Sequence, residues 1–391
     1  MVGISKLYLG QVEPSDPLRY GRMSGKLPSH LLQFAADKKP VVVWNATPAC
    51  NLRCRHCYAS QGTDRPQLST QEGFELIDQL AAFGVPVLLF SGGEPLLRQD
   101  IFELASRAVS KGLRTVFSTN GTLIDETAAR QFAALGVSYV GISLDGIPET
   151  HDAFRGVPGA YAAALRGIRL CRDLGVKVGL RVTLTRANRE QLPALFELMI
   201  RERIPRICLY HLVSTGRGAA LASDDLTPTE RRETVETIID LTRQHESNRL
   251  EVLTVDNHCD GPLLYLRLLR EGRSEQAARV LRLLRMNGGN SSGLGIASIG
   301  WDGTVYPDQF WRSKPLGKVP ETPFGDVWGN PAEGSLLCQL RNRGEYLEGR
   351  CRRCRFLDIC GGNFRARAEA ATGNIWGEDP DCYLTDKEIG L

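Results

Sequence analysis

Residues 50 to 57 read CNLRCRHC, which places Cys50, Cys54 and Cys57 in the spacing C-x3-C-x2-C. Three thiolates in so short a loop can hold three irons of a cubane cluster and leave its fourth iron open for a ligand. Structural zinc is the alternative, but it takes four protein ligands, and His56 would have to supply the fourth. The loop therefore predicts an iron–sulfur cluster with an open position, with zinc as the alternative metal.

The sequence around this loop alternates short apolar runs with longer amphipathic ones from position 41 to about 213. This alternation is typical of repeated strand–helix units with a parallel sheet, either closed as a barrel or left open. In both arrangements functional groups lie at the C-terminal ends of the strands, which is where the cysteine loop begins. The predicted strands are Val41 to Asn45, Pro86 to Phe90, Arg114 to Ser118, Ser138 to Ser143, Lys177 to Leu184 and Arg206 to Leu212.

Helix boundary signals separate these strands. Ser69 with Glu72 forms a capping box, in which each side chain binds the backbone N–H of the other residue. Asp100 and Asp125 are in position to cap the next two helices, because their carboxylates can accept hydrogen bonds from the first free N–H groups. Glycines follow the predicted helix ends at Gly84, Gly112, Gly136 and Gly175.

The pattern changes after about residue 220 to two helical stretches, Pro228 to Gln244 and Gly261 to Arg285. A run rich in Gly and Asn, from Asn287 to Gly293, then predicts a domain boundary. Beyond it the sequence indicates a β-hairpin that turns at Asp302-Gly303. We therefore expect an N-terminal extension over 1–40, a strand–helix domain over 41–220, a helical connector over 221–290 and a cysteine-rich domain over 291–391.

The composition is that of a folded globular protein, with 391 residues of which 42% are hydrophobic and 24% charged. No apolar run has the length of a signal peptide or a membrane span, so we expect a cytoplasmic protein with no membrane partner. In a reducing compartment the eleven cysteines are expected to ligate metal rather than to form disulfides. The net charge of +3 is too small to indicate nucleic-acid binding.

Arginines are concentrated late in the chain. A solvated surface would explain such a group, and a site for a polyanionic small molecule is the alternative. The group consists of Arg341, Arg343, Arg350, Arg352, Arg353, Arg355, Arg365 and Arg367.

Polar motifs follow the second, third and fourth predicted strands, and they read SGGEP from Ser91, STNG from Ser118 and SLDG from Ser143. Each motif alone is weak, because such sequences also occur as ordinary turns. Together, and in this order after the cysteine loop, they resemble the radical S-adenosylmethionine (SAM) superfamily. The resemblance implies a partial (βα)6 barrel of the TIM type, and cleavage of SAM by a reduced 4Fe-4S cluster to give a 5′-deoxyadenosyl radical.

The same resemblance implies a set of SAM contacts. Glu94 and the glycines before it would contact the amino group of SAM, and Ser143 and Arg155 would hold ribose and carboxylate groups. Leu212 would face the adenine, and His56, in a position that is commonly aromatic in the family, would pack against it. The full predicted set is Gly92, Gly93, Glu94, Ser118, Asn120, Ser143, Asp145, Arg155, Arg181, Leu212 and His56.

A second cysteine group near the C-terminus resembles the SPASM and Twitch extensions of radical SAM enzymes. It reads Cys351-x2-Cys354-x5-Cys360 and is followed by Cys382, and four thiolates suit a closed auxiliary 4Fe-4S cluster, with zinc as the alternative. A full SPASM domain would carry further cysteines where this chain has Asp308 and Phe364. We therefore expect one auxiliary cluster, two clusters in all, and core or inert roles for Cys171, Cys208, Cys259 and Cys338.

Nearly the whole chain also resembles the tetrapyrrole-modifying radical SAM enzymes. The likeness is carried by ISKLY at residues 4–8, the segments 18–34 and 37–45, TVDNHCDG at residues 254–261 and CGGNFRARAEAATG at residues 360–373. This group includes the AhbC-type 12,18-didecarboxysiroheme deacetylases and the NirJ proteins of heme d1 synthesis. The N-terminal segment is most similar to the AhbC type.

That resemblance implies removal of the two acetate side chains of 12,18-didecarboxysiroheme to give Fe-coproporphyrin III, with an electron donor such as ferredoxin or flavodoxin. The late arginines would then bind substrate carboxylates. Asp308 and His258 are the candidate catalytic residues, Asp308 as a proton donor or oxygen ligand and His258 as a ligand of the substrate iron. Tyr210-His211 is a further candidate contact. The alternatives are loss of propionates from the same substrate, modification of a peptide, and a non-enzymatic iron–sulfur scaffold.

Overall fold

The computed structural model describes residues 1–10, 39–59 and 65–391. The chain forms two compact units, each built from separate stretches of sequence. We call the unit of residues 38–180 and 292–341 the loop unit, because it contains the C-x3-C-x2-C loop, and the unit of residues 1–37, 181–291 and 342–391 the tail unit. The predicted domain boundaries near 40, 220 and 290 stay predictions, and the segment 18–34 lies outside the described residues.

The loop unit is built on a parallel sheet. Its strands β2 (Val41–Asn45), β3 (Val87–Ser91), β4 (Arg114–Thr119) and β5 (Tyr139–Ser143) pair side by side in sequence order. All four agree with the predicted strands to within one residue at each end. On the other side of β2, strand β9 (Ile296–Ile299) pairs parallel to it. The antiparallel strands β10 (Thr304–Tyr306) and β11 (Gly317–Lys318) complete the sheet.

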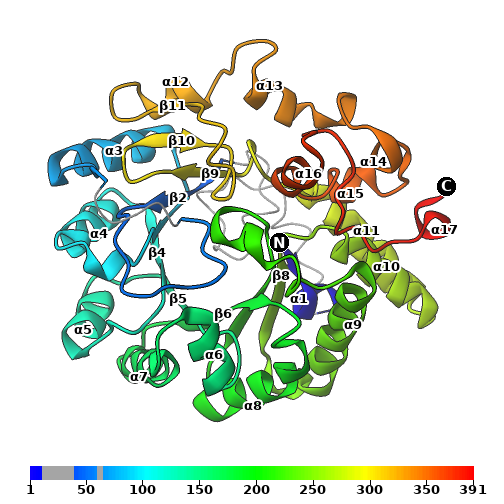
Figure 1. Cartoon of the computed structure of the whole chain (residues 1–391), viewed down its shortest axis with the longest axis horizontal. Coiled ribbons are helices and arrows are strands. Elements are labelled where there is room, and N and C mark those ends of the chain that lie inside the picture. The colour runs from blue at the N-terminus through cyan, green and yellow to red at the C-terminus, as the bar shows by residue number, and fades with distance from the viewer. Residues whose placement is uncertain (11–38, 60–64) are drawn as a thin grey trace. The chain divides into compact units, whose positions relative to one another are not determined.

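Helices of the loop unit follow the strands as predicted, and α3, α4, α5 and α7 lie along one side of β2 to β5 (Figure 1). The capping box of Ser69 and Glu72 is confirmed, and so is the cap that Asp125 provides. The predicted cap by Asp100 is wrong, because its carboxylate binds the Arg98 guanidinium instead, at 2.6 Å. The helices are α3 (Thr70–Phe83), α4 (Ile101–Ser110), α5 (Glu126–Ala134), α6 (Pro148–Arg155), α7 (Ala160–Asp173), α12 (Phe324–Trp328) and α13 (Leu336–Arg341), with the short turn η3 (Pro95–Leu97).

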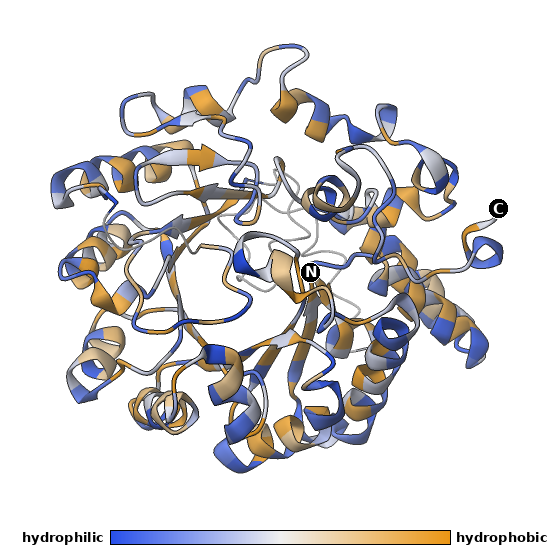
Figure 2. Ribbon diagram, viewed as in Figure 1, coloured by the Kyte–Doolittle hydropathy of each residue, from blue (hydrophilic) through white to orange (hydrophobic). Residues whose placement is uncertain are grey.

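Aromatic side chains fill the space between the sheet and the helices of the loop unit. The rings of Phe90 and Phe117 stack at 5.1 Å, and Phe117 meets Phe132 edge-on at 4.8 Å; none of the three side chains is exposed. Full burial of a phenylalanine contributes roughly 1.5–3 kcal/mol. In Figure 2 the apolar sides of α3 and α4 face the strands and their polar sides face outward. This packing fixes the carboxyl ends of the strands, where the polar motifs begin.

In the tail unit, β7 (Arg206–His211) pairs parallel with β8 (Glu251–Val255), and β1 (Val2–Gly3) runs antiparallel to β8. Strand β6 (Val178–Leu184), which crosses the division between the units, lies beside β7. The sequence predicted β6 and β7 but not β8 or β1. The helices are α1 (Ile4–Tyr8), α8 (Leu192–Glu202), α9 (Pro228–Gln244), α10 (Asp260–Arg270), α11 (Ser274–Asn287), α14 (Gly349–Arg353), α15 (Leu357–Cys360), α16 (Arg365–Thr372) and α17 (Asp386–Ile389).

Glycines explain three features of the C-terminal half. The single helix expected from Gly261 to Arg285 is two helices, because Gly272 takes a left-handed conformation, with φ +74°, between them. The run from Asn287 to Gly293 was predicted to be a domain boundary. Its first residues pack closely against the backbone of Cys360. A Cβ at Gly289 would lie 2.1 Å from the Cys360 carbonyl oxygen, and the Asn290 N–H donates to that oxygen at 3.1 Å. The predicted hairpin is confirmed, with Gly303 at φ +84° in its turn.

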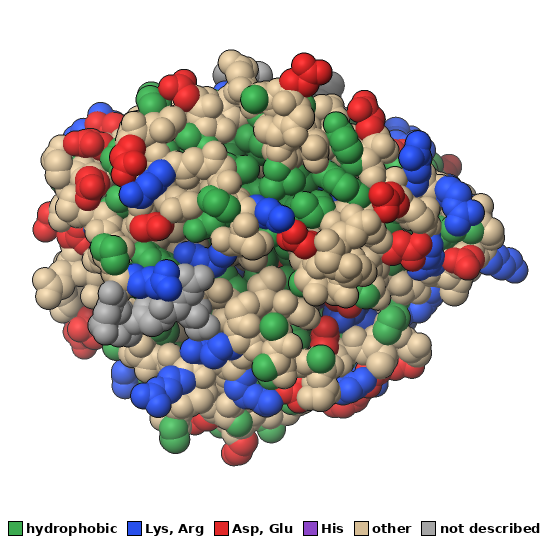
Figure 3. All heavy atoms as spheres, turned by 45° about the horizontal axis from the view of Figure 1, so that its top comes forward, with side chains coloured by type: hydrophobic (Ala, Val, Ile, Leu, Met, Phe, Trp, Pro, Cys, Tyr) green, Lys and Arg blue, Asp and Glu red, His purple; other side chains and the backbone are tan. Residues whose placement is uncertain are grey.

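Charged side chains of both signs are interspersed on the face drawn in Figure 3, and neither sign dominates a continuous patch. Among residues 1–10, 39–59 and 65–391, no helix has both the length and the apolar character needed to cross a bilayer.

Candidate functional site

The cysteine loop of residues 50–57 is held in place through its backbone. The N–H of Arg53 donates to the Arg155 carbonyl at 3.1 Å, and that of Arg55 donates to the Phe154 carbonyl at 2.9 Å. Cys54 is buried, and Cys50 and Cys57 are half-buried. Burial raises the pKa of the Cys50 thiol to about 11, so a metal that favours the thiolate is needed to ionise it at neutral pH. The donor set of three neighbouring thiols fits an iron–sulfur cluster.

The glycines after β3 bring two backbones together. The Gly93 N–H donates to the Thr47 carbonyl at 2.8 Å, and a Cβ at Gly93 would lie only 2.0 Å from the Ala49 carbonyl oxygen. Gly92 has φ +135° and equally little room, because its Cβ would lie 2.6 Å from the Thr47 carbonyl oxygen. The sequence predicted that these glycines let the main chain approach a ligand. The structure shows that they let it approach the residues that lead into the cysteine loop.

Glu94 is completely buried, and backbone and hydroxyl groups hold its carboxylate. One oxygen accepts from the Asn120 N–H at 2.8 Å, and the other accepts from the Thr119 hydroxyl at 2.7 Å and from the Leu96 N–H at 3.2 Å. Burial nevertheless raises the pKa of Glu94 to about 7. A positively charged ligand group beside this carboxylate would favour its ionised form.

A buried ion pair lies beside the cysteine loop. The Arg155 Nε donates to Asp145 at 2.6 Å, and its Nη1 lies 3.6 Å from the Cys54 sulfur. His151 accepts the Asp145 N–H at 3.0 Å, and burial lowers the pKa of this histidine to about 4. Arg155 therefore places a positive charge next to a cysteine sulfur. Its predicted contact with a SAM carboxylate stays a prediction.

The other predicted SAM contacts fall in both units. His56 stacks flat on Phe154, with ring centroids 4.4 Å apart. Ser118 and Ser143 are half-buried at the ends of β4 and β5, and the Asn120 amide donates to Asn51 at 2.8 Å. Two predicted contacts belong to the tail unit. They are Arg181, whose guanidinium lies 4.6 Å from the centroid of the Tyr210 ring, and Leu212, which is buried.

In the tail unit, Cys351, Cys354, Cys360 and Cys382 line one hollow with an empty volume of about 450 Å³. Three of these thiols come from α14, α15 and the turn between them, and the fourth comes from the C-terminal segment. The hollow is also lined by apolar side chains, Phe356, Leu357, Leu384 and Ile389, and by polar or charged ones, Arg350, Asn363, Glu378 and Asp379. In the described part of the chain, no three His, Cys, Asp or Glu side chains gather as a single metal ion would require.

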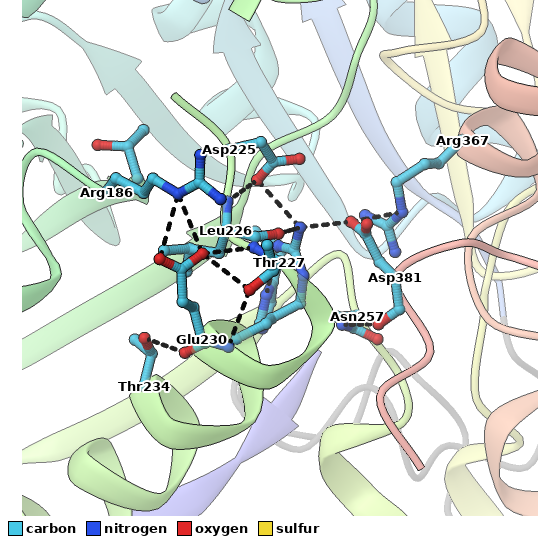
Figure 4. A network of polar contacts seen from close by, with 12 residues as sticks. Arg186, Asp225, Leu226, Thr227, Glu230, Thr234, Asn257, Arg367 and Asp381 are labelled. Carbon is cyan, nitrogen blue, oxygen red and sulfur yellow. Dashed lines mark hydrogen bonds and ion pairs between the residues drawn. The ribbon is translucent and has the colours of Figure 1, made fainter. Parts of the chain in front are cut away.

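A network of buried charges fixes the segment that carries Cys382 (Figure 4). Arg367 binds Asp379 through two hydrogen bonds, of 2.8 and 2.9 Å, and Asp381 at 2.9 Å. Asp381 also pairs with Arg231 of α9 at 3.0 Å, and Arg231 in turn binds Asp225 at 3.0 Å. Removing one partner of a buried ion pair costs about 3–5 kcal/mol, because the other charge stays buried without compensation. Sequence reasoning missed this network, because its members lie up to 156 positions apart, from Asp225 to Asp381.

Cys259, expected to be inert, lies beside the second cysteine group. Its thiol is completely buried and lies 3.0 Å from the side-chain oxygen of Asn257. The nearby Cys259 thiol lowers the pKa of Cys382 to about 7. The sequence offered one signal, since Cys259 stands in the segment TVDNHCDG that carried the likeness to tetrapyrrole-modifying enzymes.

The two candidate catalytic residues lie in different units. Asp308 is buried in the loop unit, accepts from the Ser292 hydroxyl and from the Phe310 N–H at 2.8 Å, and burial raises its pKa. His258 is buried in the tail unit, where burial keeps its pKa well below the usual range and its Nδ1 has no hydrogen-bond partner among the described residues. Both ring nitrogens of His211 have hydrogen-bond partners, because its Nε2 lies 2.9 Å from Asp260 and its Nδ1 lies 3.3 Å from Arg231.

Most of the late arginines hold the chain's own backbone and carboxylates rather than facing a ligand. Arg365 donates to the carbonyls of Ile375 and Gly377, at 3.0 and 2.6 Å, and Arg343 donates to Asn290 at 2.7 Å. The prediction that the group as a whole binds carboxylates is therefore not supported. The arginines with such internal partners are Arg341, Arg343, Arg350, Arg365 and Arg367, whereas Arg352, Arg353 and Arg355 are exposed.

Two family models match the parts of the chain that contain the cysteine groups. The family model of the radical SAM superfamily matches residues 44–199, which contain the cysteine loop and the strand-end motifs SGGEP, STNG and SLDG. A second family model, SPASM, described as an iron–sulfur cluster-binding domain, matches residues 292–355, which include Cys351 and Cys354.

Relatives match over most of the chain. An Fe-coproporphyrin III synthase of Methanosarcina barkeri is 56% identical over 398 residues, covering 100% of this chain and 99% of that protein. A pre-heme d1 synthase of Dinoroseobacter shibae is 42% identical, covering 90% and 88% respectively. Among solved structures, Streptococcus suis SuiB bound to the precursor peptide SuiA covers 90% of this chain and 76% of that one, with a TM-score of 0.71 and 19% identity. That structural likeness supports the predicted α/β fold alone.

Proposed function

The chain belongs to the radical SAM superfamily and carries a SPASM domain, and from this premise we propose that it is a tetrapyrrole-modifying enzyme of heme biosynthesis. SAM and iron–sulfur clusters are its cofactors. The reaction that we propose is removal of the two acetate side chains of 12,18-didecarboxysiroheme to give Fe-coproporphyrin III. The observation that carries it is the 56% identity, over the full length of both chains, to an Fe-coproporphyrin III synthase.

We further propose that the protein holds two 4Fe-4S clusters. Cys50, Cys54 and Cys57 would hold the cluster that binds SAM, because three thiols leave one iron open. The four thiols around the hollow of the tail unit would hold the auxiliary cluster. Buried Asp308 and Phe364 stand where further SPASM cysteines would be needed, which argues against a third cluster. A ferredoxin or flavodoxin would supply the electrons.

When bound, the open cluster and SAM supply a radical that can abstract hydrogen from an unactivated carbon. The protein's own part is to bind SAM and the substrate, to orient them and to exclude water. Glu94 would accept the ammonium group of SAM, since it is a buried carboxylate held by Asn120 and Thr119. Arg155 would balance the negative charge on Cys54. Asp308, with its raised pKa, is suited to hold a proton, and neutral His258 is suited to ligate iron.

The affinity for SAM should rise with pH in the window below the pKa of Glu94. Burial raises that pKa to about 7, so the carboxyl is protonated below it and must lose its proton before it can pair with an ammonium group. We expect the dissociation constant of SAM to fall about tenfold per pH unit from about pH 5.5 and to level off above about pH 7.5. Calorimetric titration of the reconstituted protein measures this. Glu94→Gln should bind more weakly and without pH dependence, and a flat profile in the unsubstituted protein would refute the assignment.

The reaction is tested by anaerobic incubation of the reconstituted protein with SAM, dithionite and 12,18-didecarboxysiroheme. We expect an iron tetrapyrrole product and 5′-deoxyadenosine, both identified by mass spectrometry. Cys57→Ser is the matched control, because it removes one cluster thiol from the loop unit and should form neither product. Absence of 5′-deoxyadenosine from the unsubstituted protein would reject the enzyme in favour of an iron–sulfur scaffold.

A further inference from the structure

Two buried asparagines connect the cysteine-rich segment of the tail unit to His258. The side-chain oxygen of Asn363 accepts from the His258 N–H at 2.6 Å, and its amide group donates to the side-chain oxygen of Asn257 at 2.7 Å. Asn257 donates in turn to the Asp381 carbonyl at 3.1 Å, a contact that is drawn in Figure 4. Asn363 also lines the hollow of the four cysteines. This residue therefore contacts both the proposed cluster site and the segment that carries His258.

The directions of these hydrogen bonds are set by the backbone groups at the two ends. The Asp381 carbonyl can only accept, so Asn257 turns its NH2 group toward Asp381 and its oxygen toward Asn363. The His258 N–H can only donate, so it requires an accepting oxygen at position 363. Asn257, His258, Asn363 and Asp381 are all buried, which limits competition by water. An aspartate at position 363 could still accept from His258, whereas a glycine could not.

Asn363 takes a left-handed backbone conformation, with φ +60°, directly after two glycines that do the same, Gly361 and Gly362. Glycine adopts this region without a steric cost, and Asn is among the few other residues that tolerate it. A third glycine would therefore fit the backbone at least as well as Asn363 does. What the glycine would lack is the amide group, so a substitution here can separate the role of the side chain from the role of the turn.

The ring of His258 is oriented by its backbone rather than by a hydrogen bond of its own. Its Nδ1 is buried and has no partner in the described ranges 1–10, 39–59 and 65–391. A histidine that ligates a metal is usually held by a hydrogen bond to its second ring nitrogen. Here the backbone contacts must take over that function. They are the hydrogen bond to Asn363, at 2.6 Å, and a longer one from the Gly261 N–H to the His258 carbonyl, at 3.3 Å.

We propose that Asn363 is a positioning residue, which orients His258 toward the iron of the tetrapyrrole substrate and ties that ring to the segment of the auxiliary cluster. The Asn363 N–H donates to the carbonyl of Cys360, one of the proposed cluster ligands, at 3.3 Å. The same residue therefore takes its position from the cluster segment and passes it to His258 through its side-chain oxygen. The inference rests on the proposed function, in which His258 ligates the substrate iron.

The test is binding of ferric 12,18-didecarboxysiroheme to the reconstituted protein, followed by absorption and electron paramagnetic resonance spectroscopy of the substrate iron. The unsubstituted protein should give the spectrum of an imidazole-ligated iron, and His258→Ala should lose it. Asn363→Gly keeps the turn, and it should bind the tetrapyrrole about 10- to 100-fold more weakly and lose the imidazole spectrum, with the cluster iron unchanged. Asn363→Asp, which retains an accepting oxygen, should keep the spectrum. Asn248→Gly, at an exposed position of the same unit, is the matched control and should change neither property.

Full affinity and an imidazole spectrum in Asn363→Gly, with the cluster iron intact, would overturn the inference. If Asn363→Gly lost the auxiliary cluster, Asn257→Ala would replace it, because Asn257 does not line the hollow. That variant removes the partner of the Asn363 amide and should weaken imidazole ligation, so unaltered ligation would overturn the inference too. A complex of the unsubstituted protein without an imidazole ligand would refute the role of His258 and the inference with it. Absence of any complex would instead reject the proposed substrate, and the inference would fall with that proposal.

Discussion

Gly93→Ala should lower the rate of SAM cleavage by about a hundredfold or more, although the substitution adds one methyl group. The new Cβ would lie 2.0 Å from the Ala49 carbonyl oxygen and 2.8 Å from that of Pro48, and both are backbone atoms that no side-chain rotation can move away. The strand end and the segment leading into the cysteine loop would have to separate. A misplacement of about 1 Å at a reacting centre costs on the order of a hundredfold in rate. Quantification of 5′-deoxyadenosine in single-turnover reactions measures the effect.

Gly325→Ala is the matched control in the same unit. The nearest atom to its new Cβ would be a Phe83 ring carbon at 3.5 Å, an ordinary contact, so cleavage should be unchanged. Iron analysis of the Gly93 variant separates loss of the cluster from loss of alignment. Full activity in Gly93→Ala would mean that the two backbones can separate freely, contrary to the close packing that we describe.

Cys354→Ser should remove the auxiliary cluster and leave the SAM-binding cluster in place. The serine oxygen is a hard donor that suits iron–sulfur clusters poorly, and the remaining three thiols of the hollow would lack their fourth partner. We expect the iron content to fall by half and product formation to fall by more than about a hundredfold. Slow cleavage of SAM in the absence of the tetrapyrrole should persist, because Cys50, Cys54 and Cys57 belong to the loop unit.

Cys338→Ser serves as the control for Cys354→Ser, since Cys338 is half-buried in α13 and does not line the hollow. Its iron content and activity should match those of the unsubstituted protein. If Cys354→Ser kept the full iron content, the assignment of these four cysteines to one cluster would be wrong. If it lost all its iron, the two sites would not be independent.

The parts of the fold that the sequence predicted are those governed by local periodicity. Strands β2 to β7 matched to within one residue at each end because each is a short, mostly apolar run. Strand β8 was missed because Glu251 to Val255 stands between two long helical patterns, although its β-branched residues were a usable signal. Asp100 was misassigned because Arg98, two positions earlier, competes for its carboxylate.

The parts of the site that the sequence could not predict depend on contacts between distant segments. The spacing of the cysteines was enough to group them, since ligands of one cluster recur at short intervals. Nothing in the spacing of Arg367, Asp381 and Arg231 indicates that they form a buried network. The late arginines were interpreted as a solvated surface or a ligand site, whereas Arg365 and Arg343 donate hydrogen bonds to the chain's own carbonyl groups.

The most direct test of the proposed reaction is to identify which side chains, acetates or propionates, are lost from 12,18-didecarboxysiroheme. High-resolution mass spectrometry of the product, with fragmentation, locates these losses. We predict that both acetate side chains are gone, that all the propionates are retained and that the product is Fe-coproporphyrin III. A product that keeps its acetates and has altered propionates would contradict this account and assign the chain to heme d1 synthesis, the activity named for its 42% identical relative.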